Sequence, residues 1–262
     1  MGSASRTALA AGVDALAAAK GVTLATGEQL LAAARAIDGS PQLRALLADP
    51  AVEAPEKTAL VARIFGALDG TASGLLATLV GSRWSSPAQL VDGIEEVGIR
   101  AIAGAAGSVD VESELFAVRR AVSSDAELEL ALGSKLAAPQ EKAGVVSRLL
   151  AGKAGAATLA IVSHLVQSPR GRRVGALLDR AADVVADAAG SVIATVTVAA
   201  PLSASQQRSL SAALAARFGR TPRIQYVTDP AVLGGVRVQV GDTVIDGTVA
   251  SRLADLRLQL AG

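Results

Sequence analysis

The side chains best suited to chemistry by type and spacing lie near the C-terminal end, between Val232 and Thr248. This segment carries the glycine pair Gly234-Gly235 and two aspartates, Asp242 and Asp246. Paired carboxylates can act as general acid and base or hold a cation. Here they stand four positions apart across a predicted Gly241-Asp242 turn, with no histidine and no third ligand nearby. We therefore interpret them as turn and helix-cap residues.

The rest of the reactive inventory is short. The chain has no cysteine and one histidine, His164, which excludes disulfides, thiolate catalysis and a multi-histidine metal site. Gly152-Lys153 lacks the first glycine of a Walker A loop, and Gly104 and Gly107 lack the opening glycine of a dinucleotide fingerprint. No serine has a plausible base with an orienting partner. We expect a non-catalytic chain with no cofactor and no metal.

Three further features have both a structural and a functional interpretation. His164 lies in an apolar helical stretch, which favours a satisfied buried or interfacial residue over a general base. Trp84 follows a predicted helix and is interpreted as a packing anchor, with contact to a partner as the alternative. The basic cluster 169–173 (Pro-Arg-Gly-Arg-Arg) is interpreted as a solvated corner between helices, with an acidic partner surface as the alternative.

Composition bounds the class of protein. Apolar residues make up 51% of the 262 residues and aromatic residues only 2%, which favours closely packed helices over aromatic-lined ligand pockets. A formal net charge of +1 gives no electrostatic footprint for nucleic acid. The N-terminus does not resemble a signal peptide, and the longest uncharged run contains Pro201 and alternates like a strand. We expect a soluble, cytoplasmic chain that can dock on a membrane complex.

Residues up to about 190 form a series of short amphipathic helices separated by Gly, Ser and Pro. Leu60, Ile64 and Leu68 illustrate the helical spacing of the apolar residues, and Pro55 with Glu56 suits the first turn of a helix. The expected helices of the first part are 6–20, 28–37, 41–47, one beginning at 55, 71–83 and 87–103.

The helical pattern then begins again. Lys57 and Lys142 lie 85 positions apart, as do Arg63 and Arg148, and the pairs Leu79-Val80 and Leu165-Val166 lie 86 apart. A nearly constant offset indicates an internal duplication, with coincidence in an Ala/Leu-rich chain as the alternative. The second copy lacks an equivalent of the first helix and starts with 111–122. We expect a six-helix bundle over 1–107 and a second helical lobe over 108–190.

After Gly190 the period of the pattern changes from helix to strand. Residues 192–198 alternate like a strand, Ser203 to Gln206 forms a predicted capping box, and Gly219 stands at the expected C-terminal cap. A second strand over 223–228, a third over 236–240 and a short fourth strand precede an amphipathic terminal helix. The fold class expected is therefore mainly α, with duplicated helical-bundle lobes followed by a small α+β domain over 191–262.

The C-terminal segment also carries a distinctive sequence motif. Gly234-Gly235, Gly241-Asp242, Asp246-Gly247-Thr248 and Leu253 follow one another at intervals of five, three and four residues. This motif resembles the C-terminal signature of the delta subunit of F-type ATP synthase, called OSCP in mitochondria. The stretches 43–50 and 56–61 resemble the helical domain of that family, and the extra helical repeat resembles the long, duplicated forms of high-GC Gram-positive bacteria.

The resemblance implies a function that composition alone does not. Members of the family are non-catalytic components of the peripheral stalk, or stator, on the cytoplasmic side of the cell membrane. They join the catalytic head, through N-terminal segments of the alpha subunits, to the b-type stalk subunit, so that rotor torque drives ATP synthesis coupled to proton transport. It implies structural roles for the motif residues named above and two sets of partner-binding candidates. These are Leu9, Val13, Leu16, Leu75, Leu76 and Leu79 for the alpha segments, and Val249, Leu253, Leu256 and Leu260 for b.

Two other hypotheses stay open at this point. The chain could be a generic helical adaptor outside any ATP synthase, or an enzyme with an unrecognised site. Co-purification of an ATPase head would separate the stator hypothesis from both.

Overall fold

The computed structural model describes residues 1–134, 136–219, 221–230, 232, 234–240 and 243–248. Its contacts divide the chain into two compact units, Met1–Val185 and Ala186–Gly262. The predicted change from helices to strands near Gly190 falls five residues after this boundary. The mainly helical class with a small mixed sheet at the end is confirmed.

The first six helices of the helical unit form what we call the first lobe. Four of these helices begin after an N-cap residue, namely Thr23, Ser40, Asp69 and Ser86. In each case the side chain of the N-cap residue accepts a hydrogen bond from a backbone N–H of the first helical turn. This bond satisfies a donor that the helix itself leaves unpaired. The bounds differ from those expected by at most four residues, and the starts of α3 and α6 are as expected. The helices are α1 (Ser3–Ala18), α2 (Leu24–Asp38), α3 (Pro41–Ala48), α4 (Ala54–Ile64), α5 (Gly70–Gly81) and α6 (Pro87–Ala105).

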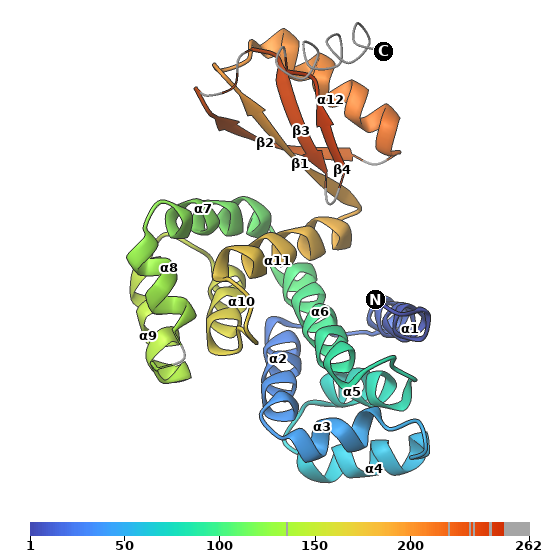
Figure 1. Cartoon of the computed structure of the whole chain (residues 1–262). Coiled ribbons are helices and arrows are strands. Elements are labelled where there is room, and N and C mark those ends of the chain that lie inside the picture. Colours follow the sequence, from blue (N-terminus) through green and yellow to red (C-terminus); the bar gives the residue numbers. More distant parts are fainter. Residues whose placement is uncertain (135, 220, 231, 233, 241–242, 249–262) are drawn as a thin grey trace, which may run out of the picture. The chain divides into compact units, whose positions relative to one another are not determined.

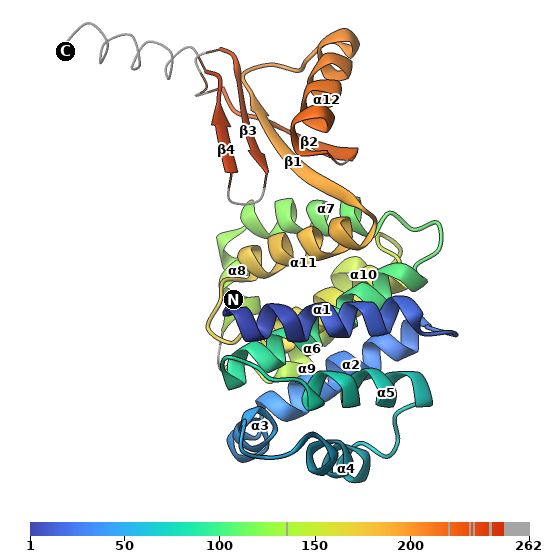
Figure 2. The ribbon, with the colours of Figure 1, turned by 90° about the vertical axis from the view of Figure 1, so that its right-hand side faces the viewer.

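Helices α2 and α6 make the most extensive helix–helix contact in the described part of this unit. Two glycines allow it: a Cβ atom on Gly27 would lie 2.7 Å from the carbonyl oxygen of Gly98. Helix α1 packs across α5 and α6, as Figure 2 shows. Burying a leucine or isoleucine fully contributes about 1.5–3 kcal/mol, and the first lobe buries many. Its fully buried large side chains include Leu30, Ile37, Leu47, Leu76, Leu79, Leu90 and Ile94.

The second lobe repeats the order of α2 to α6 of the first lobe, and the lengths of its three middle helices differ by at most one residue from those of their counterparts. Helices α8, α9 and α10 begin 85, 85 and 86 residues after α3, α4 and α5. Proline stands in the first turn of both α4 and α9, and the equivalent lysines Lys57 and Lys142 are both buried. No helix corresponds to α1 between α6 and α7. The helices are α7 (Val111–Ser123), α8 (Ala126–Gly133), α9 (Pro139–Leu150), α10 (Ala156–Gln167) and α11 (Val174–Ala188).

In its described residues, the C-terminal unit is a four-stranded mixed sheet with one helix packed on it. The strands lie in the order β2-β1-β3-β4, with β1 parallel to β2 and antiparallel to β3. Ser203 and Gln206 form the predicted capping box, and Gly219 ends the helix in the left-handed region with φ 66°. Figures 1 and 2 both show α12 against one face of the sheet. The elements are β1 (Ser191–Val198), α12 (Ala204–Phe218), β2 (Thr221–Thr228), β3 (Val236–Val240) and β4 (Thr243–Asp246).

The core of this unit follows the period-2 alternation of the strands. Ala194, Val196 and Val198 of β1 point to the same side as Val238 and Val240 of β3, and Leu214 of α12 closes that side. Arg237 and Gln239 occupy the opposite face, as the alternation predicts. The terminal helix predicted after Thr248 lies outside the described residues.

Candidate functional site

Glu95 is the centre of a buried cluster of charged side chains in the helical unit. It lies on α6 one turn after Val91 and one turn before Gly98, on the face that packs into the interior, and only 3% of the residue is exposed. Its Oε2 accepts hydrogen bonds from Arg170 Nη2 at 2.7 Å and from His164 Nε2 at 3.0 Å. Its Oε1 accepts from Arg172 Nη2 at 3.3 Å.

The charge of Glu95 is stabilised by these partners. Burial by itself raises the pKa of the carboxyl, because the interior disfavours the charged form. The hydrogen bond from His164 and the positive charges of Arg170 and Arg172 outweigh burial and bring the pKa of Glu95 to about 2. Glu95 is therefore ionised throughout the physiological range and does not serve as a proton donor.

His164 connects Glu95 to α2. Its Nδ1 lies 2.8 Å from Arg35 Nη1, and its Nε2 faces Glu95. Burial lowers the pKa of His164, the contact with Glu95 raises it, and the charges of Arg35 and Arg170 lower it, with a net decrease. The ring is therefore neutral at pH 7, and both of its nitrogens are engaged by the protein. It has no nitrogen left for a substrate, which agrees with the interpretation of His164 as a satisfied buried residue.

The basic cluster 169–173 is placed differently from the solvated corner that the sequence suggested. Arg170 reaches Asp92 Oδ1 at 2.9 Å as well as Glu95, and its side chain is only 14% exposed. Its backbone has φ 48°, a left-handed conformation that is unfavourable for a residue with a Cβ. The local prediction was wrong for Arg170 and Arg172 because their acidic partners come from α6, about 75 residues earlier.

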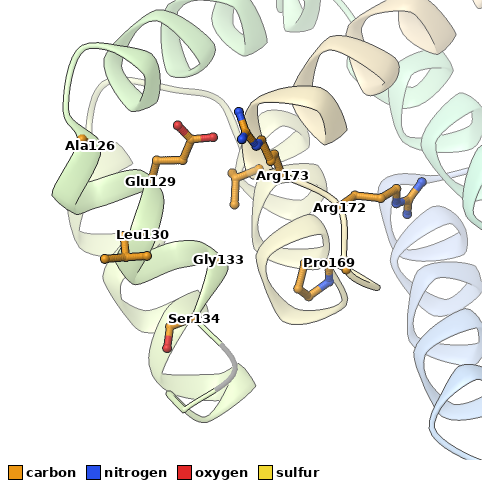
Figure 3. A pocket seen from close by; sticks show the side chains of 10 residues that line it. Ala126, Glu129, Leu130, Gly133, Ser134, Pro169, Arg172 and Arg173 are labelled. Atoms are coloured by element: carbon orange, nitrogen blue, oxygen red, sulfur yellow. The ribbon is translucent and has the colours of Figure 1, made fainter.

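A shallow hollow of about 540 Å³ lies between α8 and the turn that carries these arginines. Figure 3 shows Glu129 and Leu130 on the α8 side, whereas Arg172 points away from α8. That direction agrees with the bond of Arg172 to Glu95. A second, mainly apolar hollow of about 450 Å³ lies among α7, α8, α9 and α10, with Val118, Leu132 and Leu149 among its lining residues.

The cluster joins the two lobes rather than forming a catalytic centre. Glu95, Asp92 and Arg35 belong to the first lobe, and His164, Arg170 and Arg172 to the second. Among the described residues there is no group of three or more metal-ligating side chains that could hold an ion. Sequence reasoning missed Glu95, although one signal was present: a glutamate at an apolar-face position of α6, between Val91 and Ile102.

The alpha-binding candidates occupy different depths in the first lobe. Leu75, Leu76 and Leu79 of α5 are buried in the core, with at most 3% exposed. Leu9, Val13 and Leu16 of α1 are half-buried, and Leu9 and Leu16 pack against that core. The α5 residues are therefore part of the core of the first lobe, whereas the α1 residues keep part of their surface exposed.

Trp84 is an internal packing residue in this fold. It is 5% exposed and donates from Nε1 to the carbonyl oxygen of Leu79 at 2.7 Å. Its six-membered ring lies against Gly93 of α6, where a Cβ atom would overlap it. This agrees with the packing-anchor interpretation.

The C-terminal motif brings two backbone segments together at the end of the β3–β4 hairpin. Gly234 and Gly235 both have positive φ, and a Cβ atom on Gly235 would clash with the Gly247 carbonyl and lie 2.9 Å from Thr248 Cα. Gly247 donates its N–H to the Val236 carbonyl at 2.9 Å.

Asp246 has the turn role expected for it. Its Oδ1 accepts the N–H of Thr248 at 3.0 Å, and hydrogen bonds from the backbone and side chain of Thr248 lower the pKa of Asp246. Gly241 and Asp242 lie outside the described residues, as do Val249, Leu253, Leu256 and Leu260.

Comparisons with known proteins agree with the C-terminal motif. A family model described as ATP synthase delta (OSCP) subunit matches residues 99–260. The chain is 53% identical over 264 residues to ATP synthase subunit delta of Leifsonia xyli and 42% identical over 271 residues to that of Streptomyces griseus, with all of both chains covered in each case. Among solved structures, a chain of the Toxoplasma gondii mitochondrial ATP synthase hexamer matches with 27% identity and a TM-score of 0.40, covering 63% of this chain and 97% of that one.

Proposed function

This chain belongs to the ATP synthase delta (OSCP) subunit family, a non-catalytic component of the complex, and we propose that it is the stator link between the catalytic head and the peripheral stalk. The single observation that carries the proposal is the end-to-end match to delta subunits, which includes the second helical lobe. The same match decides against an adaptor outside ATP synthase and against an unrecognised enzyme.

The mechanical task explains why a binding protein without a reactive site is suited to this position. Torque from the rotor would turn the head as well unless a static connection held it. Such a connection needs two attachment surfaces on one chain and contacts that last through many cycles. The two compact units supply separate surfaces, and apolar helix-in-groove contacts of the i, i+3, i+4 kind supply lasting ones.

For the head, the proposed surface is α1 with α5 beneath it. Leu9, Val13 and Leu16 keep part of their apolar surface accessible, and an amphipathic segment of the alpha subunit would cover it. Completing the burial of a half-exposed valine contributes about 0.75–1.5 kcal/mol, which corresponds to a roughly four- to twelvefold change in affinity.

For the stalk, the proposed surface is the terminal segment 249–262. Val249, Leu253, Leu256 and Leu260 recur at intervals of four, three and four residues, the spacing of one apolar helix face. None of the helices in the described residues is long and apolar enough to cross a membrane. We propose a peripheral position at the cytoplasmic face of the cell membrane, where the b subunit holds the chain to the complex.

Titration of the full-length chain with two peptides tests both attachments. One peptide is the N-terminal segment of alpha and the other the membrane-distal end of b. Val13→Asp is expected to weaken alpha-peptide binding at least tenfold and leave b-peptide binding unchanged. The double variant Leu253→Asp, Leu256→Asp is expected to do the reverse.

Ala36→Asp, at an exposed position of α2, is the matched control and is expected to affect neither peptide. Far-UV circular dichroism of each variant confirms that it is folded. Retained binding of both peptides by both test variants, or loss of both peptides by either folded variant, would contradict the assignment of two separate surfaces.

A further inference from the structure

The bridge Arg35–His164–Glu95 fixes one tautomer of the histidine. Arg35 approaches Nδ1 at 2.8 Å, and a guanidinium group can only donate a hydrogen bond. Nδ1 must therefore be the acceptor, and the ring proton must sit on Nε2, where it is donated to the Glu95 carboxylate at 3.0 Å. Neutral His164 thus holds α10 to two helices of the first lobe at once, to α2 through Nδ1 and to α6 through Nε2.

In the described residues, each element that packs against α10 carries charged groups. Arg35 comes from α2, Glu95 and Asp92 from α6, and Arg170 and Arg172 from the turn before α11. Glu114 of α7 accepts from the N–H of Gly155 and the hydroxyl of Thr158 in the first turn of α10, and α9 contributes the buried Lys142. Around the imidazole itself, three guanidinium groups therefore meet two carboxylates.

A proton on Nδ1 would act differently on the two sides of the ring. The Nδ1–H group and the Arg35 N–H would be two donors at 2.8 Å, both on positively charged groups, in a site where His164 is 1% exposed. Withdrawal of the Arg35 side chain removes this repulsion, and the contact between α10 and α2 through Arg35 is then lost. On the other side, the imidazolium would face the ionised Glu95 and form a stronger, charge-assisted hydrogen bond.

We propose that the Arg35–His164–Glu95 bridge is an acid-released catch between the two helical lobes. Protonation of His164 at Nδ1 expels Arg35 and opens the α2–α10 contact, whereas the α6–α10 contact at Glu95 persists. The second lobe then moves about α6 rather than separating from the first lobe. The bridge lies within the helical unit and acts whatever partners the chain binds.

The direction in which the pKa of His164 is shifted determines how opening depends on pH. An ordinary histidine has a pKa of about 6.5, and that of His164 is lowered in the closed form. In the open form Arg35 has left and Glu95 remains, so the pKa of His164 is higher than in the closed form. The closed form is therefore fully favoured above the open-form pKa, and the opening equilibrium constant grows up to about tenfold per pH unit below it. The growth stops below the lowered pKa, where both forms are protonated.

Distances between introduced labels test the proposal, since the natural chain has no cysteine. Ala36→Cys on α2 with Gln167→Cys on α10 reports one contact, and Ala88→Cys on α6 with Gln167→Cys reports the other. Pulsed electron paramagnetic resonance on the full-length chain is expected to show a longer and broader α2–α10 distance at about pH 5 than at about pH 7.5, because a histidine changes its charge in this range. The α6–α10 distance is expected to stay the same.

His164→Gln is the matched control, because its amide can accept from Arg35 and donate to Glu95 but does not titrate. It is expected to keep the α2–α10 distance constant over the same range. The proposal is overturned if the natural chain shows no change, if both distances change together, or if His164→Gln responds like the natural chain.

Nuclear magnetic resonance of the imidazole gives a second, independent readout, because His164 is the single histidine. The ring nitrogens are expected to report the Nε2–H tautomer near neutral pH and a pKa below about 6.5. Arg35→Gln is expected to raise that pKa, because it removes a positive charge beside Nδ1. An Nδ1–H tautomer, or a pKa that Arg35→Gln leaves unchanged, would refute the catch.

Discussion

Replacing Glu95 by glutamine removes the negative charge at the centre of the cluster and keeps the shape of the side chain. The pKa of Glu95 is about 2, against an ordinary value of 4.5. At about 1.4 kcal/mol per pH unit, this difference corresponds to about 3 kcal/mol of unfolding free energy at neutral pH. The residue is 3% exposed, so solvent screening reduces this figure little. The E95Q variant also leaves Arg170 and Arg172 with only Asp92 of the two carboxylates that they share, which acts in the same direction.

Urea unfolding of the full-length chain, monitored by tryptophan fluorescence, measures this loss of stability in the helical unit, which contains both Glu95 and Trp84. Trp84 is the single tryptophan and is buried in the first lobe. Asp179→Asn is the matched control, since it breaks an ion pair between Arg119 and Asp179 in which the Asp179 side chain is 56% exposed. A pair of that exposure is expected to contribute less than about 1 kcal/mol. A loss for E95Q below about 1 kcal/mol, or no larger than that of the control, would refute the reasoning about Glu95.

The remaining predictions concern acid and the C-terminal unit. The folded-state pKa of Glu95 lies below its ordinary value, so its contribution is present above pH 4.5 and is lost as pH falls through about 2; fluorescence-monitored acid unfolding should show this loss in the natural chain and not in E95Q. Gly235→Ala combines φ 82° with a backbone clash and should destabilise the C-terminal unit by about 2–4 kcal/mol. Gly219 has φ 66° but open space around it, so Gly219→Ala should destabilise the C-terminal unit by only about 1 kcal/mol. Equal destabilisation by Gly235→Ala and Gly219→Ala, measured by amide hydrogen exchange of the sheet, would refute the backbone clash at Gly235. Ser203→Ala removes the capping box of α12 and should cost about 1 kcal/mol by the same measurement; an unchanged exchange rate would contradict the role of that cap.

The internal duplication shows how much of the helical unit the sequence pattern predicted. Offsets of 85 and 86 residues between lysines and between leucine–valine pairs predicted the repeat, and the helices α8, α9 and α10 follow it at the same offsets from α3, α4 and α5. Lys57 and Lys142 are buried in equivalent helices, which the offset alone did not imply. The absence of a counterpart of α1 from the second lobe was also readable, because no amphipathic stretch stands between 105 and 111.

The sequence by itself determined the elements and the family of this protein. Helix starts depend on a Ser, Thr or Asp side chain and on proline in the first turn, strands on alternation, and the cap of α12 on Gly219, all of which act within a few residues along the chain. The C-terminal motif from Gly234 to Thr248 likewise depends on backbone geometry that only certain residues permit. Glycines there allow positive φ and a close approach of two backbone segments.

Only the tertiary structure decided what the charged residues do. Glu95 lies 69 residues from His164 and 75 from Arg170 along the chain. The local sequence around any one of these residues does not predict that it contacts the other two. A buried charge is stable only when its partners arrive from other elements, so its protonation state is a property of the assembled lobes. The arginines that the sequence placed at a solvated corner are for this reason part of the joint between the two lobes.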